Sequence, residues 1–309
     1  MPAEQLLGFR EWWSPAALVG TAAVAVLYAL IVGPFRSMFP DAKPVSHWRR
    51  AAFLAGLAVH YLARGGPVDL LGHFAFSAHM VAMFMAYYLA PPLMLLGCPD
   101  WLVRPLFSRW VLRRVFGVLT APLVTAVLFN AAFSLYHFPA IHDYVMTHYT
   151  LHWWYWTGML AAAFLMWWPI LGPMRDGMRL SHLRKIAYLL LNSVLITPAC
   201  ALIIFAGEPL YATYTDATAW AKALGYCVPA ETARALAESG GPLRWAWFSP
   251  LEDQQLGGVL MKVLQEFVFG AVLGYLFFSW YREERKKDAE EDAATPGLDA
   301  AGRPGEVRP

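Results

Sequence analysis

The stretch LLGHFAFSAHMVAMFMAYYLAPPLMLLGCP, residues 70–99, holds no acidic side chain, lysine or arginine between Asp69 and Asp100. A run of about 20 apolar residues is enough to cross the hydrocarbon core of a bilayer. The same stretch contains His73 and His79 in otherwise apolar surroundings. An ionisable side chain inside a span is a candidate for function, because charge is costly in lipid. The stretch therefore predicts a transmembrane helix that carries part of a functional site.

Charge-poor runs of this kind recur along the chain, which has 309 residues, 58% of them hydrophobic and 15% charged. A soluble domain has about a quarter charged residues, so the composition indicates a membrane protein. We predict an all-α fold, a polytopic membrane helical bundle with seven transmembrane helices. The predicted spans are residues 14–35, 48–64, 71–97, 115–137, 148–170, 185–206 and 254–280.

Arginine and lysine are concentrated in the connections 36–50, 100–114 and 172–185 and after the last span, whereas the other connections have few. The positive-inside rule then places the N-terminus outside and the C-terminus in the cytoplasm. The weakest span, residues 48–64, is needed because the two basic connections, 36–50 and 100–114, would face opposite sides of the membrane without it. The net charge of +2 gives no sign of a nucleic-acid partner, and we expect none. Membrane lipid is the expected surrounding.

The predicted organisation is one membrane domain, residues 1–281, with an outer loop at residues 207–253. Within this loop, residues 229–236 predict a short helix that ends at Gly240-Gly241. The pair Pro91-Pro92 predicts a kink or break in the third span, because proline removes a backbone donor. Residues 282–309 are charged and then rich in Pro, Gly and Ala, which predicts a disordered cytoplasmic tail.

Seven of the nine histidines fall at the outer ends of the predicted spans: His60, His73, His79, His137, His142, His148 and His152. Imidazole is the commonest metal ligand among side chains, and it also binds haem iron. His79 and Met83 are four residues apart and share a helix face, and so do His148 and His152. Imidazole and thioether together suit copper, especially Cu(I), better than hard cations.

We therefore predict a metal site near the outer surface, built from His79, Met83, His137, His148 and His152. Core packing is the alternative for Met83, since methionine often fills gaps. For His73 and His142 we expect ordinary interfacial hydrogen bonds to water or to backbone carbonyls. Asp143 is a supporting residue that could orient an imidazole, and a solvated loop acid is the alternative.

The last span opens with Ser249-Pro-Leu-Glu-Asp-Gln-Gln255, in which Ser249 and Glu252 have the spacing of a capping box. Capping explains Asp253 less well, so Asp253 is a second supporting residue of the site. Lys262 and Glu266 lie one turn apart inside the span. We expect an ion pair, because unpaired charge is costly there, and a proton or ion path is the alternative.

Several blocks of residues occur together in a fixed order: residues 76–81, residues 89–99, His137-Phe-Pro139, His148 and His152 with Trp167-Trp168-Pro169, and residues 249–258. In these blocks the chain resembles the CtaG-type cytochrome c oxidase assembly factor family. The resemblance implies a seven-span protein of the bacterial cytoplasmic (inner) membrane that helps to mature a haem-copper oxidase, with a role in copper delivery. Our hypothesis is a copper-handling assembly factor that is not an enzyme. The implied partners are oxidase subunits or a periplasmic copper chaperone.

The residues that carry over from the family pattern are His79, His137, His148, His152 and Asp253. Two departures are visible. Met83 stands where the family usually has a second histidine, and methionine keeps a soft ligand there. Lys262-Val-Leu-Gln265-Glu266 stands where the family usually has Trp-Val-Pro-Gly, which suggests a divergent subgroup with a different client.

The main alternative function is a b-type haem protein, either a membrane redox carrier or a haem-handling factor, with His79 and His152 as axial ligands of haem b. Its weakness is that most of the candidate histidines lie near the surface. A copper or proton transporter is a third interpretation, although the inner halves of the predicted spans are almost wholly apolar. A structural scaffold without a metal site is the fourth.

Overall fold

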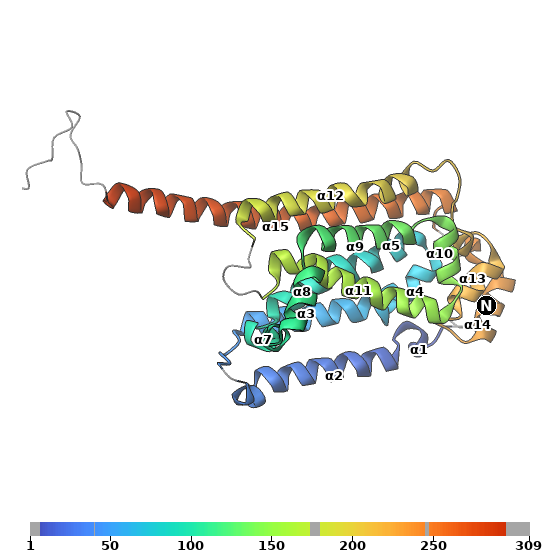
Figure 1. Ribbon diagram of the computed structural model, residues 1–309. Coiled ribbons are helices and arrows are strands. Elements are labelled where there is room, and N and C mark those ends of the chain that lie inside the picture. Colours follow the sequence, from blue (N-terminus) through green and yellow to red (C-terminus); the bar gives the residue numbers. More distant parts are fainter. Residues whose placement is uncertain (1–6, 40, 174–179, 245–246, 295–309) are drawn as a thin grey trace, which may run out of the picture.

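The computed structural model describes residues 7–39, 41–173, 180–244 and 247–294, and every regular element in these ranges is helical (Figure 1). This confirms the predicted all-α class for that part of the chain. The first half contains α1 (Phe9–Trp12), α2 (Pro15–Val32), η2 (Pro34–Met38), α3 (His47–Arg64), α4 (Pro67–Phe74), α5 (Phe76–Phe84), η3 (Met85–Leu89), α6 (Ala90–Gly97), α7 (Asp100–Ser108), α8 (Trp110–Leu119) and α9 (Pro122–Tyr136). The second half contains α10 (Pro139–Met146), α11 (Tyr149–Leu171), α12 (His182–Ile204), η4 (Ala212–Tyr214), α13 (Ala217–Leu224), α14 (Ala230–Glu238), η5 (Pro242–Arg244) and α15 (Pro250–Ala294).

Four helical stretches of the described chain are long and apolar enough to cross a membrane: α2, Phe76–Gly97, α12, and Pro250–Glu290 within α15. A fifth is added if α8 and α9, which are bent by 57°, count as one span. Helices α3 and α11 have 18 and 23 residues but are not among these stretches. Arginines in α3 and histidine, tyrosine and tryptophan in α11 lower their hydropathy. The helices support a membrane protein, and the count of seven spans stays a prediction.

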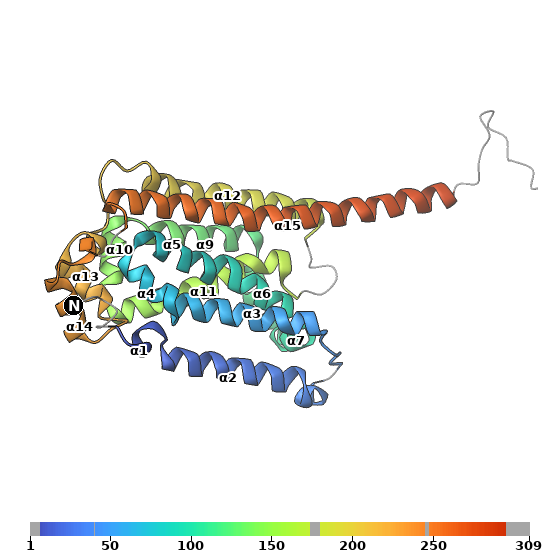
Figure 2. The same ribbon diagram turned by 180° about the vertical axis from the view of Figure 1, so that it is seen from behind.

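The long helices lie side by side with their axes roughly parallel (Figure 1, Figure 2). At one end lie α4, α10, α13 and α14, which we call the histidine end, and at the other lie α7 and α8, which we call the basic end. Helix α15 continues past the basic end to Ala294 (Figure 2). The predicted tail therefore differs from the structure over residues 282–294, which are helical. The rest of that prediction, residues 295–309, falls outside the described residues.

The third predicted span is broken near the histidine end of the bundle. Helix α4 ends at Phe74, Ala75 is extended with φ −136° and ψ 133°, and α5 starts anew at Phe76. The proline pair, by contrast, does not end the helix, because the wider turn η3 carries the chain into α6. Pro91 has no N–H for the carbonyl oxygen of Tyr87, and Trp167 Nε1 of α11 donates to that oxygen at 3.1 Å.

The break at Ala75 leaves the first N–H groups of α5 without helical partners. Asp253 of α15 supplies the missing acceptor: its Oδ2 accepts from Phe76 N at 2.6 Å and from Ser77 N at 3.3 Å. The hydroxyl of Ser77 donates to the other carboxylate oxygen. A negative charge at a helix N-terminus is also favoured by the helix dipole. The side chain of Asp253 thus caps the N-terminus of a helix whose first residue, Phe76, lies 177 positions earlier in the chain.

The residues around Asp253 fix α15 against its neighbours. Gln254 Oε1 accepts from Leu210 N at 2.7 Å, which holds the chain after α12. Glycine is required at 257, because a Cβ there would lie 2.7 Å from the ring of Phe76. The predicted capping box is confirmed, since Ser249 N donates to Glu252 Oε2 at 2.9 Å and Glu252 N donates to Ser249 Oγ at 3.3 Å.

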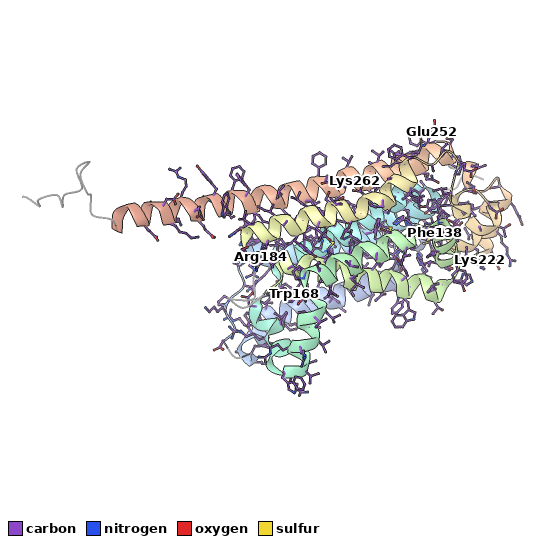
Figure 3. All side chains as sticks on the ribbon, turned by 45° about the horizontal axis from the view of Figure 1, so that its top comes forward. Phe138, Trp168, Arg184, Lys222, Glu252 and Lys262 are labelled. Atoms are coloured by element: carbon purple, nitrogen blue, oxygen red, sulfur yellow. The ribbon has the colours of Figure 1, made fainter. Side chains whose placement is uncertain are left out.

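The other local predictions on the outer loop and the last span also hold. Helix α14 ends just before Gly240 and Gly241, which adopt φ of 128° and 64°. Lys262 Nζ pairs with Glu266 Oε1 at 2.6 Å and also donates to the carbonyl oxygen of Ser193 on α12 at 3.0 Å. Figure 3 shows Lys262 further along α15 than Glu252.

We expect Asp253→Ala to lower the free energy of unfolding by about 2 kcal/mol, because two backbone donors of α5 lose their acceptor. Thermal unfolding of the purified protein in detergent measures the effect. Glu252→Ala is the matched control, because Glu252 is exposed and caps only its own helix. Equal melting temperatures for the two variants would contradict a cap that joins α15 to α5.

Candidate functional site

Five histidines come together at the histidine end, each from a different segment of the chain. His73 lies on α4, His79 on α5, His137 directly after α9, His142 on α10 and His152 on α11. We call these five residues the histidine cluster. None of the five side chains is more than 5% exposed. The arrangement therefore gathers imidazoles in a place where water is largely excluded.

Aromatic rings separate and support the imidazoles of the cluster. The ring centroids of His79 and His142 are 5.4 Å apart, and those of His73 and His152 are 6.1 Å apart. Tyr136 packs against both members of the first pair, with centroid distances of 5.7 Å to His79 and 5.0 Å to His142. Trp156 contacts His79 at 5.7 Å and His152 at 5.9 Å, so it connects the two pairs.

Four of the five imidazoles have an Nε2 atom without a hydrogen-bond partner among the described residues. These atoms belong to His79, His137, His142 and His152, and all four are buried. The Nδ1 of His137 lies 2.8 Å from the carbonyl oxygen of Phe133, and because a carbonyl only accepts, this nitrogen carries the proton. Its Nε2 then presents a lone pair. A buried polar atom without a partner is costly, so four of them in one place point to function.

His142 and Asp143 differ in how burial affects them. Burial lowers the pKa of His142, against the opposing effect of the neighbouring Asp143 carboxylate. The imidazole is therefore neutral near pH 7, which is the form that binds a metal. For Asp143, burial acts to raise the pKa, but hydrogen bonds from His142, Ala212 and Thr213 outweigh it and lower the pKa. Asp143 therefore stays ionised beside a neutral imidazole.

Asp143 attaches the outer loop to the cluster. Its Oδ2 accepts from Ala212 N at 2.9 Å, and its Oδ1 accepts from Thr213 N at 3.1 Å. The same Oδ1 lies 3.6 Å from Nδ1 of His142. The carboxylate thus holds the loop and sits next to one imidazole of the cluster.

Three aromatic residues of the loop 207–253 lie against the segments that carry the cluster. Tyr211 Oη donates to the carbonyl oxygen of His137 at 2.9 Å, and Trp220 Nε1 donates to that of His73 at 2.7 Å. Tyr214 Oη donates to the carbonyl oxygen of Gly72 at 2.7 Å. Each bond satisfies a backbone acceptor near the end of a helix. The loop is therefore tied directly to the segments that carry the histidines.

Two residues of the predicted metal site, His148 and Met83, do not belong to the histidine cluster. His148 precedes α11 and is only half-buried, with Nδ1 2.6 Å from the carbonyl oxygen of Tyr144. Its ring is tilted against that of Tyr144, with the centroids 4.0 Å apart. Met83 is fully buried and belongs to the hydrophobic core. The predicted residues that the structure brings together are His79, His137 and His152.

Two cluster residues were expected to make only interfacial hydrogen bonds. His73 does bond a backbone carbonyl, that of Asp69 at 3.0 Å, but it is buried in the cluster. His142 is wholly buried among aromatic rings. The sequence holds a signal for His142: Pro139 starts a helix, and His142, Val145 and Met146 then share its buried face. A helical period over residues 139–146 therefore points His142 inward.

The cluster is not arranged as a finished metal site. Within the part of the chain that the structure describes, no group of three or more His, Cys, Asp or Glu side chains is placed to hold a metal ion. The imidazoles would have to rotate toward one another to share an ion. The donor set itself fits a soft metal, since it offers neutral imidazole nitrogens in apolar surroundings.

The sequence matches the model of one known protein family and resembles three uncharacterized proteins. The family model described as cytochrome c oxidase caa3 assembly factor (Caa3_CtaG) matches residues 26–283. The chain is also 24% identical over 295 residues to an uncharacterized protein of Mycobacterium bovis and, by the same measure, to one of Mycobacterium tuberculosis, covering 91% of this chain and 41% of each relative. An uncharacterized protein of Mycobacterium leprae is 21% identical over 304 residues, 93% of this chain and 42% of that protein.

The chain therefore spans about two fifths of the length of these relatives. No solved structure gives a significant match. The match of residues 26–283 takes in all five histidines of the cluster and Asp253.

We expect diethylpyrocarbonate, which acylates accessible neutral imidazoles, to modify His148 in the folded protein and to leave His137 and His142 unmodified. His148 is partly exposed, whereas the other two side chains are 0% exposed. Peptide mass spectrometry after labelling in detergent measures the difference, and labelling in denaturant is the control. Modification of all three at the same rate in the folded protein would contradict a closed cluster.

Proposed function

The chain belongs to the cytochrome c oxidase caa3 assembly factor family, and we propose that it acts by taking up Cu(I) at the histidine cluster and passing it to a haem-copper oxidase. The observation that carries the copper part is the group of four buried Nε2 atoms without a hydrogen-bond partner among the described residues. Binding a soft cation would satisfy these lone pairs. Copper is the cargo in this proposal, and the chain itself performs no turnover.

His79 and His142 are the proposed first ligands, because their rings are the nearest pair of imidazoles in the cluster, at 5.4 Å. His137 and His152 would bind the ion next, as it moves through the histidine cluster. Met83, four residues after His79, is a soft ligand that could join after a side-chain rotation. A monovalent ion suits this place better than a divalent one, because burying the smaller charge costs less.

The proposal places the histidine end on the outer side of a bacterial cytoplasmic membrane, with seven spans that include α3 and α11. Helix α3 packs on α6, and α11 packs on α6 and α9, so both stand among the spanning stretches. Arginines gather toward the opposite end, where the positive-inside rule puts the cytoplasm. Figure 3 places Arg184 near that end and Lys222 at the histidine end.

A partner that exchanges copper would dock on the outer loop. Trp247 is 94% exposed and Phe248 is also exposed, at the point where the loop returns to α15. Aromatic side chains of this kind are enriched in protein interfaces. An oxidase subunit or a periplasmic copper chaperone is the proposed partner. The loop residues that cover the histidine cluster are part of the same segment. Docking of a partner on this loop would therefore move the residues that cover the cluster and give copper access to it.

Haem b is the alternative cargo or cofactor, with His79 and His152 as axial ligands. Trp156 contacts both imidazoles, with ring centroids 5.7 and 5.9 Å away. A porphyrin ring between the two histidines would have to displace this indole. This contact supports copper over haem for this pair of histidines.

We expect the protein purified in detergent to compete for Cu(I) with the chelator bathocuproine disulfonate and to bind near one equivalent. His79→Ala and His142→Ala should each weaken the affinity by at least about tenfold, whereas His148→Ala should not. The control spectrum should lack a Soret band. A Soret band that His152→Ala removes would instead assign haem, and equal copper affinity in all variants would end the copper proposal.

We expect a strain that lacks this chain to regain haem-copper oxidase activity when the wild-type or His148→Ala protein is supplied. His142→Ala should restore neither the activity nor the copper content of the oxidase, because the proposed ligand is lost. Immunoblots for the variant and for the oxidase subunits control for protein level. Full restoration by His142→Ala would mean that the family function does not pass through the cluster.

A further inference from the structure

Helices α12 and α15 lie side by side along one edge of the bundle and carry an ion pair on their exposed surface (Figure 1, Figure 2). Both helices are otherwise apolar where they are exposed, as at Val194 of α12 (67%) and Phe267 of α15 (73%). The side chains of Lys262 and Glu266 are nevertheless 25% and 45% exposed. The pair is therefore open to whatever surrounds this edge of the bundle.

The ion pair lies halfway along a helix that can span the membrane. The hydroxyl of Ser193 donates to Glu266 Oε1, and the two ends of α12, His182 and Ile204, each lie 11 positions from Ser193. At 1.5 Å per residue each end is about 16 Å away, which is about half the thickness of a hydrocarbon core. Because α12 is long and apolar enough to cross a membrane, the carboxylate of Glu266 would face the middle of the hydrocarbon core.

Only one of the two carboxylate oxygens of Glu266 has hydrogen-bond donors. Oε1 accepts from Lys262 Nζ at 2.6 Å and from the hydroxyl of Ser193, whereas Oε2 accepts no hydrogen bond from the described residues. Hydrocarbon offers no donor to such an atom, so charged side chains within spans almost always face protein or a water-filled cavity. The exposed Oε2 at this depth therefore indicates that another polypeptide with donors covers the pair.

The pair continues into a surface of small residues on α15. Four residues follow one another at intervals of four and so lie along one ridge of the helix: Lys262, Glu266, Gly270 and Gly274. A Cβ at Gly270 or Gly274 would meet no atom within 4 Å, so neither glycine is needed for packing inside the chain. Two glycines four residues apart allow membrane helices to approach each other closely. The ridge thus joins a polar pair that lacks donors to a surface suited to a second helix.

The balance of charge favours a second copy of this chain as the covering partner. Lys262 and Glu266 already neutralise each other, so a partner with a single basic side chain would leave a net charge in the hydrocarbon. A second copy brings one ammonium and one carboxylate of its own. Two copies in one membrane point the same way, and a two-fold axis along the membrane normal sets the same ridge of each against the other. Each ammonium can then lie between two carboxylates, one from each copy.

We propose that the chain forms a two-fold symmetric dimer in the membrane through α12 and α15, with the two α15 helices crossing near Gly270 and Gly274. Two ammonium groups and two carboxylates form a closed ring of charges at the centre of the interface, and Oε2 of each Glu266 gains its donor there. The inference requires α12 and α15 to span the membrane, but it does not depend on copper binding.

Energy transfer between donor-labelled and acceptor-labelled copies of the full chain in liposomes, followed as lipid dilutes the protein, measures the association. The double variant Gly270→Leu, Gly274→Leu should raise the protein density needed for half-association by at least about tenfold, because its side chains hold the two helices apart. Neither change meets an atom within the same copy. Gly158→Leu on α11 is the matched control, since it also enters open space, and it should associate like the wild type.

The double variant Lys262→Met, Glu266→Met removes both charges together and leaves none unpaired. It should also weaken association by at least about tenfold, because the ring of charges is lost. Dicyclohexylcarbodiimide, which modifies carboxyl groups exposed to lipid, should label Glu266 in the glycine double variant and spare it in the wild type.

Three results would overturn the dimer. The wild type could show only the energy transfer of randomly distributed monomers. The glycine double variant could associate as tightly as Gly158→Leu. Glu266 could be labelled at the same rate in the wild type and in the glycine double variant, which would mean that lipid itself surrounds the pair.

Discussion

The carboxylate of Asp253 holds together two helices that the chain places far apart, and the geometry of the histidine end depends on this contact. Because α5 starts afresh at Phe76, its free N–H groups need an acceptor, and α15 supplies it. The break turns α4 away from α5, so that His73 and His79 approach the cluster from separate helices. One hydrogen-bonded cap therefore fixes the last helix, the broken third span and two of the imidazoles.

Local patterns in the sequence predicted the helical class, the capping box at Ser249, the glycine stop after α14 and the Lys262–Glu266 pair, because each depends on residues only a few positions apart. The break at Ala75 was not predictable, since alanine favours a helix and the compensating acceptor lies 177 positions away. Spacing alone paired His148 with His152. It could not show that His148 turns back to the Tyr144 carbonyl while His142 points inward.

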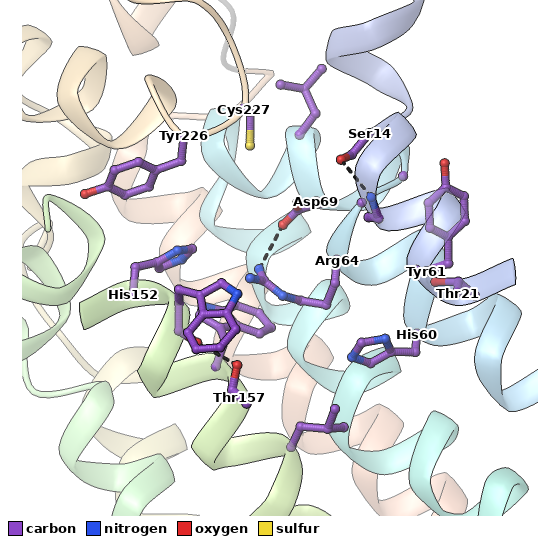
Figure 4. A pocket seen from close by; sticks show the side chains of 18 of the residues that line it. Ser14, Thr21, His60, Tyr61, Arg64, Asp69, His152, Thr157, Tyr226 and Cys227 are labelled. Carbon is purple, nitrogen blue, oxygen red and sulfur yellow. Dashed lines mark hydrogen bonds and ion pairs between the residues drawn. The ribbon is translucent and has the colours of Figure 1, made fainter. Parts of the chain in front are cut away.

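Helices α3 and α11, the two long helices that are not apolar enough to count as spans, both carry polar side chains that line a cleft of about 760 Å³ beside the histidine cluster (Figure 4). Helix α3 contributes His60, Tyr61 and Arg64, and α11 contributes His152 and Trp156. Hydropathy averages a helix over all its faces, so inward polar groups weaken the signal although the outer face can still meet lipid. The inward-facing polar side chains of α3 and α11 thus explain both the polar interior and the weak hydropathy signal of these two helices.

Helix α15 is continuous over 45 residues, about 67 Å at 1.5 Å per residue. That length is about twice the thickness of a hydrocarbon core. Its first turns carry the cap of α5, and its last turns project beyond the basic end of the bundle (Figure 2). One uninterrupted helix therefore carries both the carboxylate that caps α5 and the segment beyond the basic end, so the two ends of the bundle share a single structural element.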